Sequence, residues 1–427
     1  MKWWWPVFVG VYPWALWPDG THTIASSYLE HYIFAGVAVA GWILLLLADK
    51  DATWSNSFRN LLASVRSNPP LAAAIAFGAW VIAASIFSPE PSISLTGSIE
   101  DYSGSALYMV VLVIIYNFIY LYYYSHDTKP IFKAIVFSAL LLVLASTYEV
   151  ITGNAVFYSI KPERHPMVSF LGYGHLAGFL ALASGLLVSL PSRLPILMLL
   201  FLLSLGMGLT NNRSSVLATL LSATAVNLYF SLKKVLLLLL VITIGVLAGW
   251  IIVNYSGGNL RSDMARSTTL EARLAYWKMA LSGIRERPLT GWGGGQYYLH
   301  LGDVAKPADI KVFLQSSDIS LLYYSSNIFM YKDKYGTLRM EKISSWSAHN
   351  FMLDIALDFG IPGLLLYLLL VYFNLRNCFL GNPAAVATIT YHVFLLMWPI
   401  AIEASAVLWI VMALGALPKK PSGRFLF

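Results

Sequence analysis

The stretch KVLLLLLVITIGVLAGWIIV, residues 234–253, decides the fold, because it holds no charged residue after Lys234. A helix needs about 20 apolar residues to cross a ~30 Å hydrocarbon core. The whole chain shares this character: 58% of its 427 residues are hydrophobic and 11% are charged. A soluble domain has about 25% charged residues. The sequence therefore predicts a polytopic membrane protein.

The same criterion, applied outward from this stretch, predicts an all-α protein with about twelve transmembrane helices. The apolar runs cover residues 4–18, 31–48, 71–87, 104–124, 131–151, 171–190, 193–210, 214–232, 234–253, 350–375, 384–400 and 402–417. Nine of these helices lie within residues 1–253 and three within 349–427, and a large loop, 254–348, separates the two groups. The single cysteine, Cys378, excludes disulfides and cysteine zinc sites.

The Lys and Arg residues of the short loops predict the orientation. If the N-terminus is cytoplasmic, the cytoplasmic segments hold 13 of these residues, whereas the short outer loops hold only Lys161, Arg164 and Arg213. Both termini are therefore predicted to be cytoplasmic, and residues 254–348 form an outer loop. The topology accounts for most of the net charge of +7, so we predict no nucleic-acid partner.

The outer loop, residues 254–348, is predicted to be partly helical. Its 12 basic and 8 acidic residues make up 20 of the 49 charged residues of the chain. Leu274–Leu281 has apolar residues at helical spacing, and we interpret the following Gly291–Gly295 as a turn, because it lacks the setting of a P-loop. The apolar segments Ile319–Tyr324 and Ile328–Tyr331 are predicted either to pack as a cap over the helices or to lie on the membrane surface.

His349 lies in Ser345–Phe351, where this loop meets the next apolar run. An imidazole at that junction can titrate and can meet a lipid-borne substrate. No His or Glu follows at i+3 or i+4, so we predict no metal site. Two interpretations stay open, a polar residue at a helix start or a general base, and the ordinary His pKa of about 6.5 suits the second. Asp354 and Asp358 share a face of the next helix, where one can orient a partner.

Two arginines, which allow two interpretations each, and one histidine are further candidates. Arg213 either reaches the interface as an anchor or binds a phosphate with its planar guanidinium. Arg273, preceded by Arg261 and Arg266, is either part of a solvated face or a site for a lipid pyrophosphate above the membrane. His175 begins an apolar run, which favours a histidine satisfied within the bundle.

The order of these motifs resembles the O-antigen ligase / O-antigen polymerase superfamily of bacterial membrane glycosyltransferases. The matching motifs are Ser94–Ser98 with Gly104, Arg164 before a Gly-rich segment, Asn212-Arg213-Ser214, Arg273-x-x-x-Trp277 leading into Arg287–Gly293, and Ala348-His349-Asn350 with Phe359–Gly363. They span residues 90–375 approximately. One departure is Asn211-Asn212, which stands where small Gly or Ser residues are expected.

The resemblance implies a GT-C-like fold in the bacterial inner membrane, surrounded by membrane lipids. It implies transfer of a glycan from undecaprenyl pyrophosphate to a hydroxyl acceptor on the periplasmic face, with inversion and with no metal or cofactor. The positions that match the catalytic residues of the family are His349, Arg213 and Arg273. The substrate-binding candidates are Arg164, Arg266 and Asn350.

The acceptor of such a reaction stays open in the sequence. A ligase uses lipid A–core, a polymerase uses a second lipid-linked repeat, and a protein oligosaccharyltransferase uses Ser or Thr of a pilin-like protein. The compact chain with its single large loop favours the ligase. A transporter of the same lipid-linked glycan would require charged residues deep within the spans. Glu149 and Glu403 lie near predicted outer ends instead, which favours an enzyme.

Overall fold

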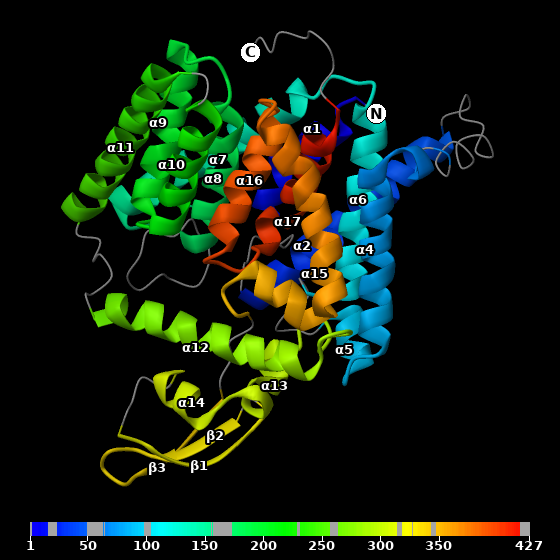
Figure 1. The fold of residues 1–427 in the computed structure, drawn as a ribbon. Coiled ribbons are helices and arrows are strands. Elements are labelled where there is room, and N and C mark those ends of the chain that lie inside the picture. Colours follow the sequence, from blue (N-terminus) through cyan, green and yellow to red (C-terminus); the bar gives the residue numbers. More distant parts are fainter. Residues whose placement is uncertain are drawn as a thin grey trace.

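The computed structural model describes residues 2–15, 24–48, 63, 65–97, 104–154, 156, 173–228, 231–256, 264–313, 318–326, 328–342 and 347–418. Figure 1 shows a bundle of helices with one long helix, α12 (Met264–Glu286), crossing one of its ends. A small group of helices and strands lies beyond α12. We call this end of the molecule the cap end.

The bundle contains a helix in each of the twelve predicted apolar runs. Its elements are α1 (Trp4–Val11) with η1 (Tyr12–Trp14), α2 (Ile24–Ala48), α4 (Pro69–Ile86), α6 (Ala106–Tyr123), α7 (Lys129–Thr152), α8 (Tyr173–Val188), α9 (Leu194–Leu209), α10 (Arg213–Asn227), α11 (Leu232–Tyr255), α15 (Phe351–Cys378), α16 (Pro383–Leu395) and α17 (Ile402–Ala416). Within the described residues, five helices, α4, α6, α7, α11 and α15, are long and apolar enough to cross a membrane, and several shorter apolar helices join them. The protein is thus a mostly helical, multi-pass membrane protein, and the count of twelve crossings stays a prediction.

Helix α17 forms the centre of the bundle, whereas α11 lies at its surface (Figure 1). Every residue from Ile402 to Ala416 is buried. A helix that is apolar and buried all round belongs to a core surrounded by other helices. By contrast, α11 exposes a row of large side chains, Leu236, Leu240, Leu247 and Ile251. Such a row suits contact with lipid, which is the environment that the hydropathy predicts.

The cap consists of α12, α13 (Tyr297–Val304), α14 (Pro307–Phe313) and a three-stranded antiparallel sheet. The strands are β1 (Ser320–Ser325), β2 (Ile328–Lys332) and β3 (Leu338–Lys342). The prediction of an all-α protein is therefore wrong in the cap. Two local signals explain the sheet: Phe329 and Tyr331 alternate into a buried face, and Asp333 Oδ1 accepts hydrogen bonds from the backbone of Tyr335 and Thr337, both at 2.9 Å.

The apolar segments of the cap pack inward. Phe329 of β2 and Ile310 of α14 share a hydrophobic cluster with Met279 of α12 and Leu357 of α15. The sequence predicted that these segments either pack as a cap over the bundle or lie on the membrane surface. The structure shows the first arrangement for β2. Because the cluster includes α15, the cap and the bundle are joined through a common core.

The Gly-rich segment after α12 ties the cap to the bundle on two sides. Trp292 and Gly293 donate their N–H groups to the carbonyls of Leu357 and Asp358 of α15, at 2.8 and 2.9 Å. On the other side, Gly294 N–H donates to Ser94 Oγ of α5 (Pro91–Thr96) at 2.9 Å. Sequence analysis predicted only a turn here. The segment is a tether that fixes where α12 lies.

Helix α15 bends at Gly360, where φ is +71°. A Cβ atom there would overlap the carbonyl of Leu289, so glycine is required both by the backbone and by the space. The bend lets Ile361 N–H donate to Pro288 O at 2.8 Å. The first turns of α15 therefore lie against the cap, and the rest of the helix runs through the bundle.

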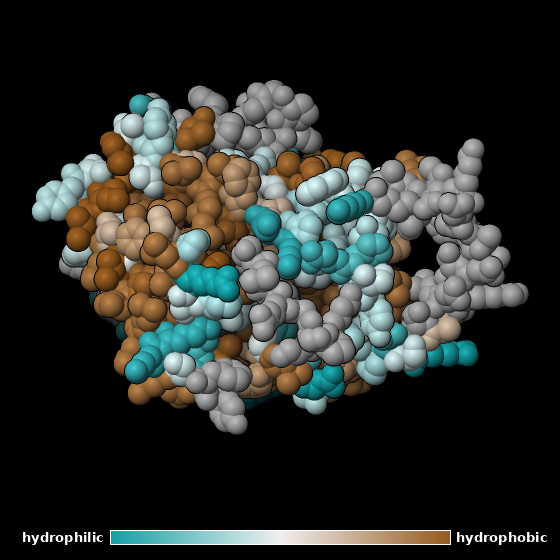
Figure 2. Space-filling model, turned by 90° about the horizontal axis from the view of Figure 1, so that it is seen from above, coloured by the Kyte–Doolittle hydropathy of each residue, from teal (hydrophilic) through white to brown (hydrophobic). Residues whose placement is uncertain are grey.

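The end opposite the cap carries exposed basic side chains at helix ends. They are Lys133 of α7, Arg193 before α9, Lys233 of α11 and Arg376 of α15. Figure 2 shows this face, where hydrophilic residues form several patches among hydrophobic ones. The start of α1 and the end of α17 lie here as well (Figure 1). We call it the basic end.

Candidate functional site

His349 lies in a short loop whose backbone is held by hydrogen bonds. Its N–H donates to Ser347 Oγ at 2.8 Å, and the Ser347 hydroxyl donates to Asp354 Oδ2 at 2.6 Å. The other oxygen of Asp354 accepts the N–H of Ala348 at 2.7 Å. Asp354, one of the two candidate orienting carboxylates, thus fixes the loop that carries the histidine. Asp358, the other candidate, accepts the N–H of Gly293 with its backbone carbonyl at 2.9 Å.

The backbone of His349 itself is strained. Its φ is +53°, a left-handed conformation that is uncommon outside glycine and that Asn, Asp and His adopt more often than other residues. Strain of this kind costs on the order of 1–3 kcal/mol and persists where the surroundings impose it, often at functional sites. Here the hydrogen bonds of Ser347 and Asp354 impose it. The loop is shaped to hold the imidazole in one place.

The imidazole lies between two aromatic rings. The ring centroids of Tyr276 and His349 are 5.5 Å apart, and those of His349 and Trp398 are 6.1 Å apart in an edge-to-face arrangement. The guanidinium of Arg273 lies over the Trp398 ring, 5.4 Å from its centroid. Trp398, in the connection between α16 and α17, therefore contacts both of the predicted catalytic residues Arg273 and His349.

The surroundings keep His349 uncharged at neutral pH. Burial, the positive charge of Arg273 and the proximity of His175, in that order, lower the pKa of His349 from 6.5 to about 4. Its Nδ1 atom is buried and has no hydrogen-bond partner among the described residues. A buried ring nitrogen of this kind can accept a hydrogen bond from a ligand hydroxyl group.

An ion pair between a partly buried histidine and a buried glutamate lies near His349. His175 Nδ1, at the start of α8, lies 3.1 Å from Glu403 Oε2 in the first turn of α17. Sequence analysis favoured a satisfied bundle histidine at this position, and Glu403 is the partner that this interpretation required. The position of the pair was not predicted, because its two residues are more than 200 positions apart in the sequence. Its electrostatic effect reaches His349.

Arg213 begins α10 and is exposed. Asn212 caps this helix, since its Oδ1 accepts the N–H groups of Ser214 and Ser215 at 3.0 and 3.1 Å. Asn211 has a φ of +49°, which asparagine tolerates. The two asparagines that depart from the family pattern thus have structural roles. The Arg213 guanidinium has no ion pair or hydrogen bond within the described part of the chain.

Arg213 belongs to the cap end of the bundle. The backbones of α9 and α11 run parallel in close contact: Gly245 meets Phe201, and Gly249 meets Leu209. The end of α9, and with it Arg213, therefore lies beside the end of α11, from which the chain continues to α12. The structure brings Arg273 and His349 together and leaves Arg213 at the same end without a contact to either.

Of the three predicted substrate-binding residues, the structure describes the side chain of one. Asn350 caps α15, because its Oδ1 accepts the N–H groups of Met352 and Leu353 at 3.1 and 3.2 Å. This is a structural role that the sequence analysis did not assign to it. Arg164 lies outside the described residues. Arg266 belongs to the backbone of α12, but its side chain is outside the described part.

The sequence analysis missed Trp398, Tyr276 and Glu403 as parts of this site. Tyr276 had a usable signal, because it follows Arg273 by three positions and so shares its helix face. Glu403 was noticed only as a carboxylate near an outer end. For Trp398, an aromatic residue among many, we find no signal in the sequence.

Comparison with known families gives a match. Residues 196–368 match the family model described as O-antigen ligase. The matched region runs from α9 into α15 and includes Arg213, Arg273 and His349. Among the curated proteins, a search finds no match to this chain. The family match confirms the resemblance found in the sequence, to the O-antigen ligase / polymerase superfamily.

Proposed function

We propose that this chain is an O-antigen ligase, and the proposal rests on the match of its residues 196–368 to the O-antigen ligase family model. In this proposal it transfers a glycan from undecaprenyl pyrophosphate to a hydroxyl of lipid A–core, on the periplasmic face of the bacterial inner membrane. The observation that carries the proposal is the placement of Arg273 and His349 against one ring, Trp398.

The charge distribution supports this orientation. Exposed basic residues at helix ends lie opposite the cap, and Lys and Arg are retained on the cytoplasmic side of bacterial membranes. The basic end, with the start of α1 and the end of α17, is then cytoplasmic. The cap and His349 are periplasmic, where lipid-linked glycans and lipid A–core can meet.

The arginines have the chemistry that the leaving group needs. In the proposed step the bond between the anomeric carbon and the phosphate oxygen breaks, and its electron pair stays on undecaprenyl pyrophosphate. Negative charge grows on that oxygen, and guanidinium donors placed beforehand stabilise it. Arg273 is held in place by Trp398, and Arg213 is exposed at the same end of the bundle. We assign both to the pyrophosphate.

His349 has the chemistry that the acceptor needs. The acceptor oxygen attacks the anomeric carbon from the face opposite the leaving group, which inverts the centre, and its proton passes to His349. The low pKa keeps the imidazole neutral and able to accept this proton. When the donor pyrophosphate pairs with Arg273, one cause of the low pKa is offset. Donor binding thus makes His349 a stronger base.

Substrate binding completes the proposal. The Asn350 side chain uses its oxygen for the helix cap, which leaves its NH₂ group to donate to a sugar oxygen. Arg266 precedes Arg273 on the same helix, and Arg164 belongs to a predicted outer loop. We assign the two arginines to the anionic donor. Neither the reaction nor the residues of the site require a metal or a cofactor in this scheme.

A reconstituted assay tests the function. Purified protein in liposomes receives a lipid-linked glycan, with lipid A–core, a second lipid-linked repeat and a Ser/Thr-containing pilin peptide as competing acceptors. The proposal predicts glycan on lipid A–core. Extension of the repeat would make the protein a polymerase, and glycan on the peptide would make it a protein oligosaccharyltransferase. Movement of unreacted glycan across the membrane would instead indicate a transporter.

A further inference from the structure

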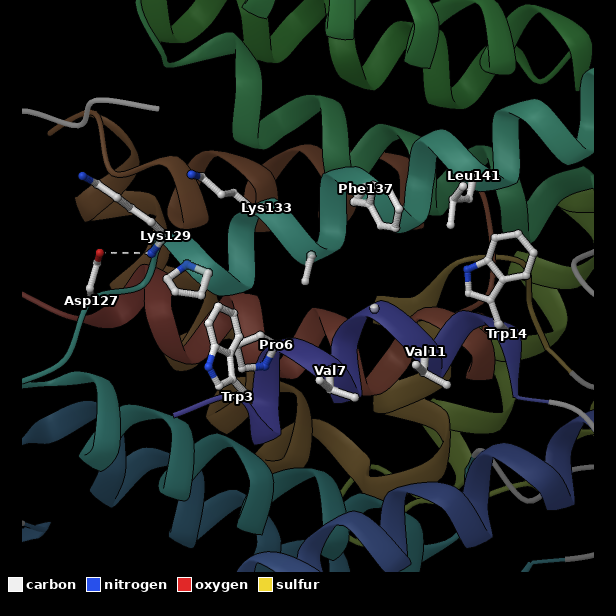
Figure 3. Close-up of a pocket in the computed structure, with 13 residues that line it drawn as sticks. Trp3, Pro6, Val7, Val11, Trp14, Asp127, Lys129, Lys133, Phe137 and Leu141 are labelled. Atoms are coloured by element: carbon white, nitrogen blue, oxygen red, sulfur yellow. Dashed lines mark hydrogen bonds between the residues drawn. The ribbon is translucent and has the colours of Figure 1, made fainter. Parts of the chain in front are cut away.

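A groove lies on the outside of the bundle between α1 and α7. It encloses about 860 Å³, and none of its lining residues belongs to the site around His349. Figure 3 shows it as a channel along the two helices, with Lys129 and Lys133 near one end and Trp14 and Leu141 near the other. The lysines mark the basic end of the molecule. The groove is therefore a feature separate from glycan transfer.

The walls of the groove are apolar and open to the outside. Val7 and Val11 of α1 face Phe137 and Leu141 of α7 across it, and Phe137 is 62% exposed. The floor is narrow, because a Cβ atom on Gly10 would lie 3.8 Å from that of Ala134. Small residues let two helices approach at this level. Larger residues on either side then leave a channel that an apolar chain can fill.

The mouth of the groove is positively charged. Lys129 and Lys133 line it, and the exposed Lys2 adjoins the lining residue Trp3. One carboxylate lies among them, that of Asp127, and it accepts the backbone N–H of Lys129 at 3.1 Å. Two ammonium groups therefore line the mouth together with one carboxylate. Trp3, 64% exposed, is a residue type that lies at the level of lipid headgroups.

The length of the groove matches one leaflet. From Lys129 to Leu141, twelve residues of helix rise about 18 Å, at ~1.5 Å per residue. Half of a ~30 Å hydrocarbon core is about 15 Å. A chain that enters at the charged mouth therefore ends near the bilayer midplane, so the groove fits one acyl chain of one leaflet.

We propose that this groove binds an anionic glycerophospholipid of the leaflet at the basic end. One acyl chain fills the channel over Gly10, and the headgroup phosphate pairs with Lys129 and Lys133. The isoprenoid of the proposed donor fits less well, because its pyrophosphate belongs at the cap end, opposite these lysines. An apolar helix of another protein would leave the ammonium groups at the mouth without an anion.

Native mass spectrometry of the full-length protein in detergent tests the site. Phosphatidylglycerol and phosphatidylethanolamine with identical acyl chains are added separately, and bound lipid is counted. The wild type is expected to prefer phosphatidylglycerol. Charge reversal in the Lys129→Glu/Lys133→Glu variant should weaken its binding roughly 10- to 30-fold. The matched control, Arg193→Glu/Lys233→Glu, lies at the same end outside the groove and should bind as the wild type does.

A second variant tests the channel itself. Gly10→Leu places a side chain in the groove and should reduce the binding of both lipids, whereas Gly36→Leu, built where a Cβ meets nothing within 4 Å, should not. Equal binding of the two lipids by the wild type would overturn the headgroup assignment. Unchanged binding by Gly10→Leu, or a bound second copy of the chain in place of lipid, would overturn the site. Glycan transfer by all four variants stays normal, so the outcome is independent of the proposed function.

Discussion

Arg273 and Arg213 lie at the same end of the bundle in very different surroundings. Arg273 lies over Trp398 beside a partly buried histidine with a positive φ, whereas Arg213 projects from the start of α10 with no partner in the described structure. The first arginine is positioned by the protein before any substrate arrives. For the second, no residue in the described part of the chain does this. Pre-organised groups contribute more to a transition state than groups that must be ordered during the reaction.

The largest effect should come from removing the imidazole at the pre-organised site. His349→Asn is the sharpest change, because asparagine also adopts a φ of +53° and so keeps the conformation of the loop. Transfer in the reconstituted assay should fall about 10²- to 10⁴-fold, the usual contribution of a general base. Insertion and thermal stability should match the wild type. Transfer at the wild-type rate by this variant would exclude His349 as the base.

Arg273→Lys should have the next largest effect. A lysine keeps the charge but loses both the planar donors and the stacking on Trp398, so kcat should fall about 10²-fold. Trp398→Leu serves as the companion variant, since it keeps Arg273 but removes its platform. If kcat falls by about the same factor in Trp398→Leu, the position of the guanidinium matters as much as its charge. A Lys variant with full activity would contradict the assignment.

Arg213→Lys sharpens the comparison, because this arginine has no ion pair or hydrogen bond to lose among the described residues. We expect a smaller fall in kcat/KM, about 10-fold, from the loss of bidentate phosphate binding. The measurement is the KM for the lipid-linked donor, which should rise while the KM for the acceptor stays constant. If the Lys variant transfers normally, Arg213 is only an anchor at the membrane interface.

The smallest predicted change concerns the ion pair behind His349. Glu403→Gln removes the charged partner of His175. The positive charge of His175 helps to lower the pKa of His349, and this charge is less stable without Glu403. The acidic limb of the plot of kcat/KM against pH should therefore move to higher pH. At pH 7 the transfer rate should fall by less than about 10-fold. A purely structural role for Glu403 would lower the amount of folded protein and leave the limb in place.

Hydropathy predicted the bundle helices, because the need to satisfy backbone groups in lipid acts locally along the chain. It could not reveal the sheet of the cap, whose first strand, β1, has no regular alternation of buried residues. Charge counting predicted that His349 and Arg213 share one end. The contact of Trp398 with His349 depends on how α12, α15 and the connection after α16 pack together. No local pattern carries that information.

The Gly-rich tether shows the same limit. Its glycines read as a turn in the sequence, yet Gly294 and Trp292 pair with segments roughly 200 and 65 residues away. Positive φ angles at Gly291, Gly293 and Gly295 are compatible with any turn. Only the packing shows that the tether determines where α12, and therefore Arg273, lies relative to His349.

The pH dependence of transfer tests the central claim, that His349 is a base kept neutral by burial and by Arg273. Because its pKa is lowered, the base form persists as the pH falls below 6.5 and is lost only near pH 4. In the reconstituted assay, kcat/KM, which reports the free enzyme, should stay level from pH 7 and fall through an acidic limb near pH 4. The limb of kcat should lie at higher pH, because bound pyrophosphate offsets Arg273. A kcat/KM limb at the ordinary histidine value of about 6.5, unmoved by Arg273→Gln, would contradict the account.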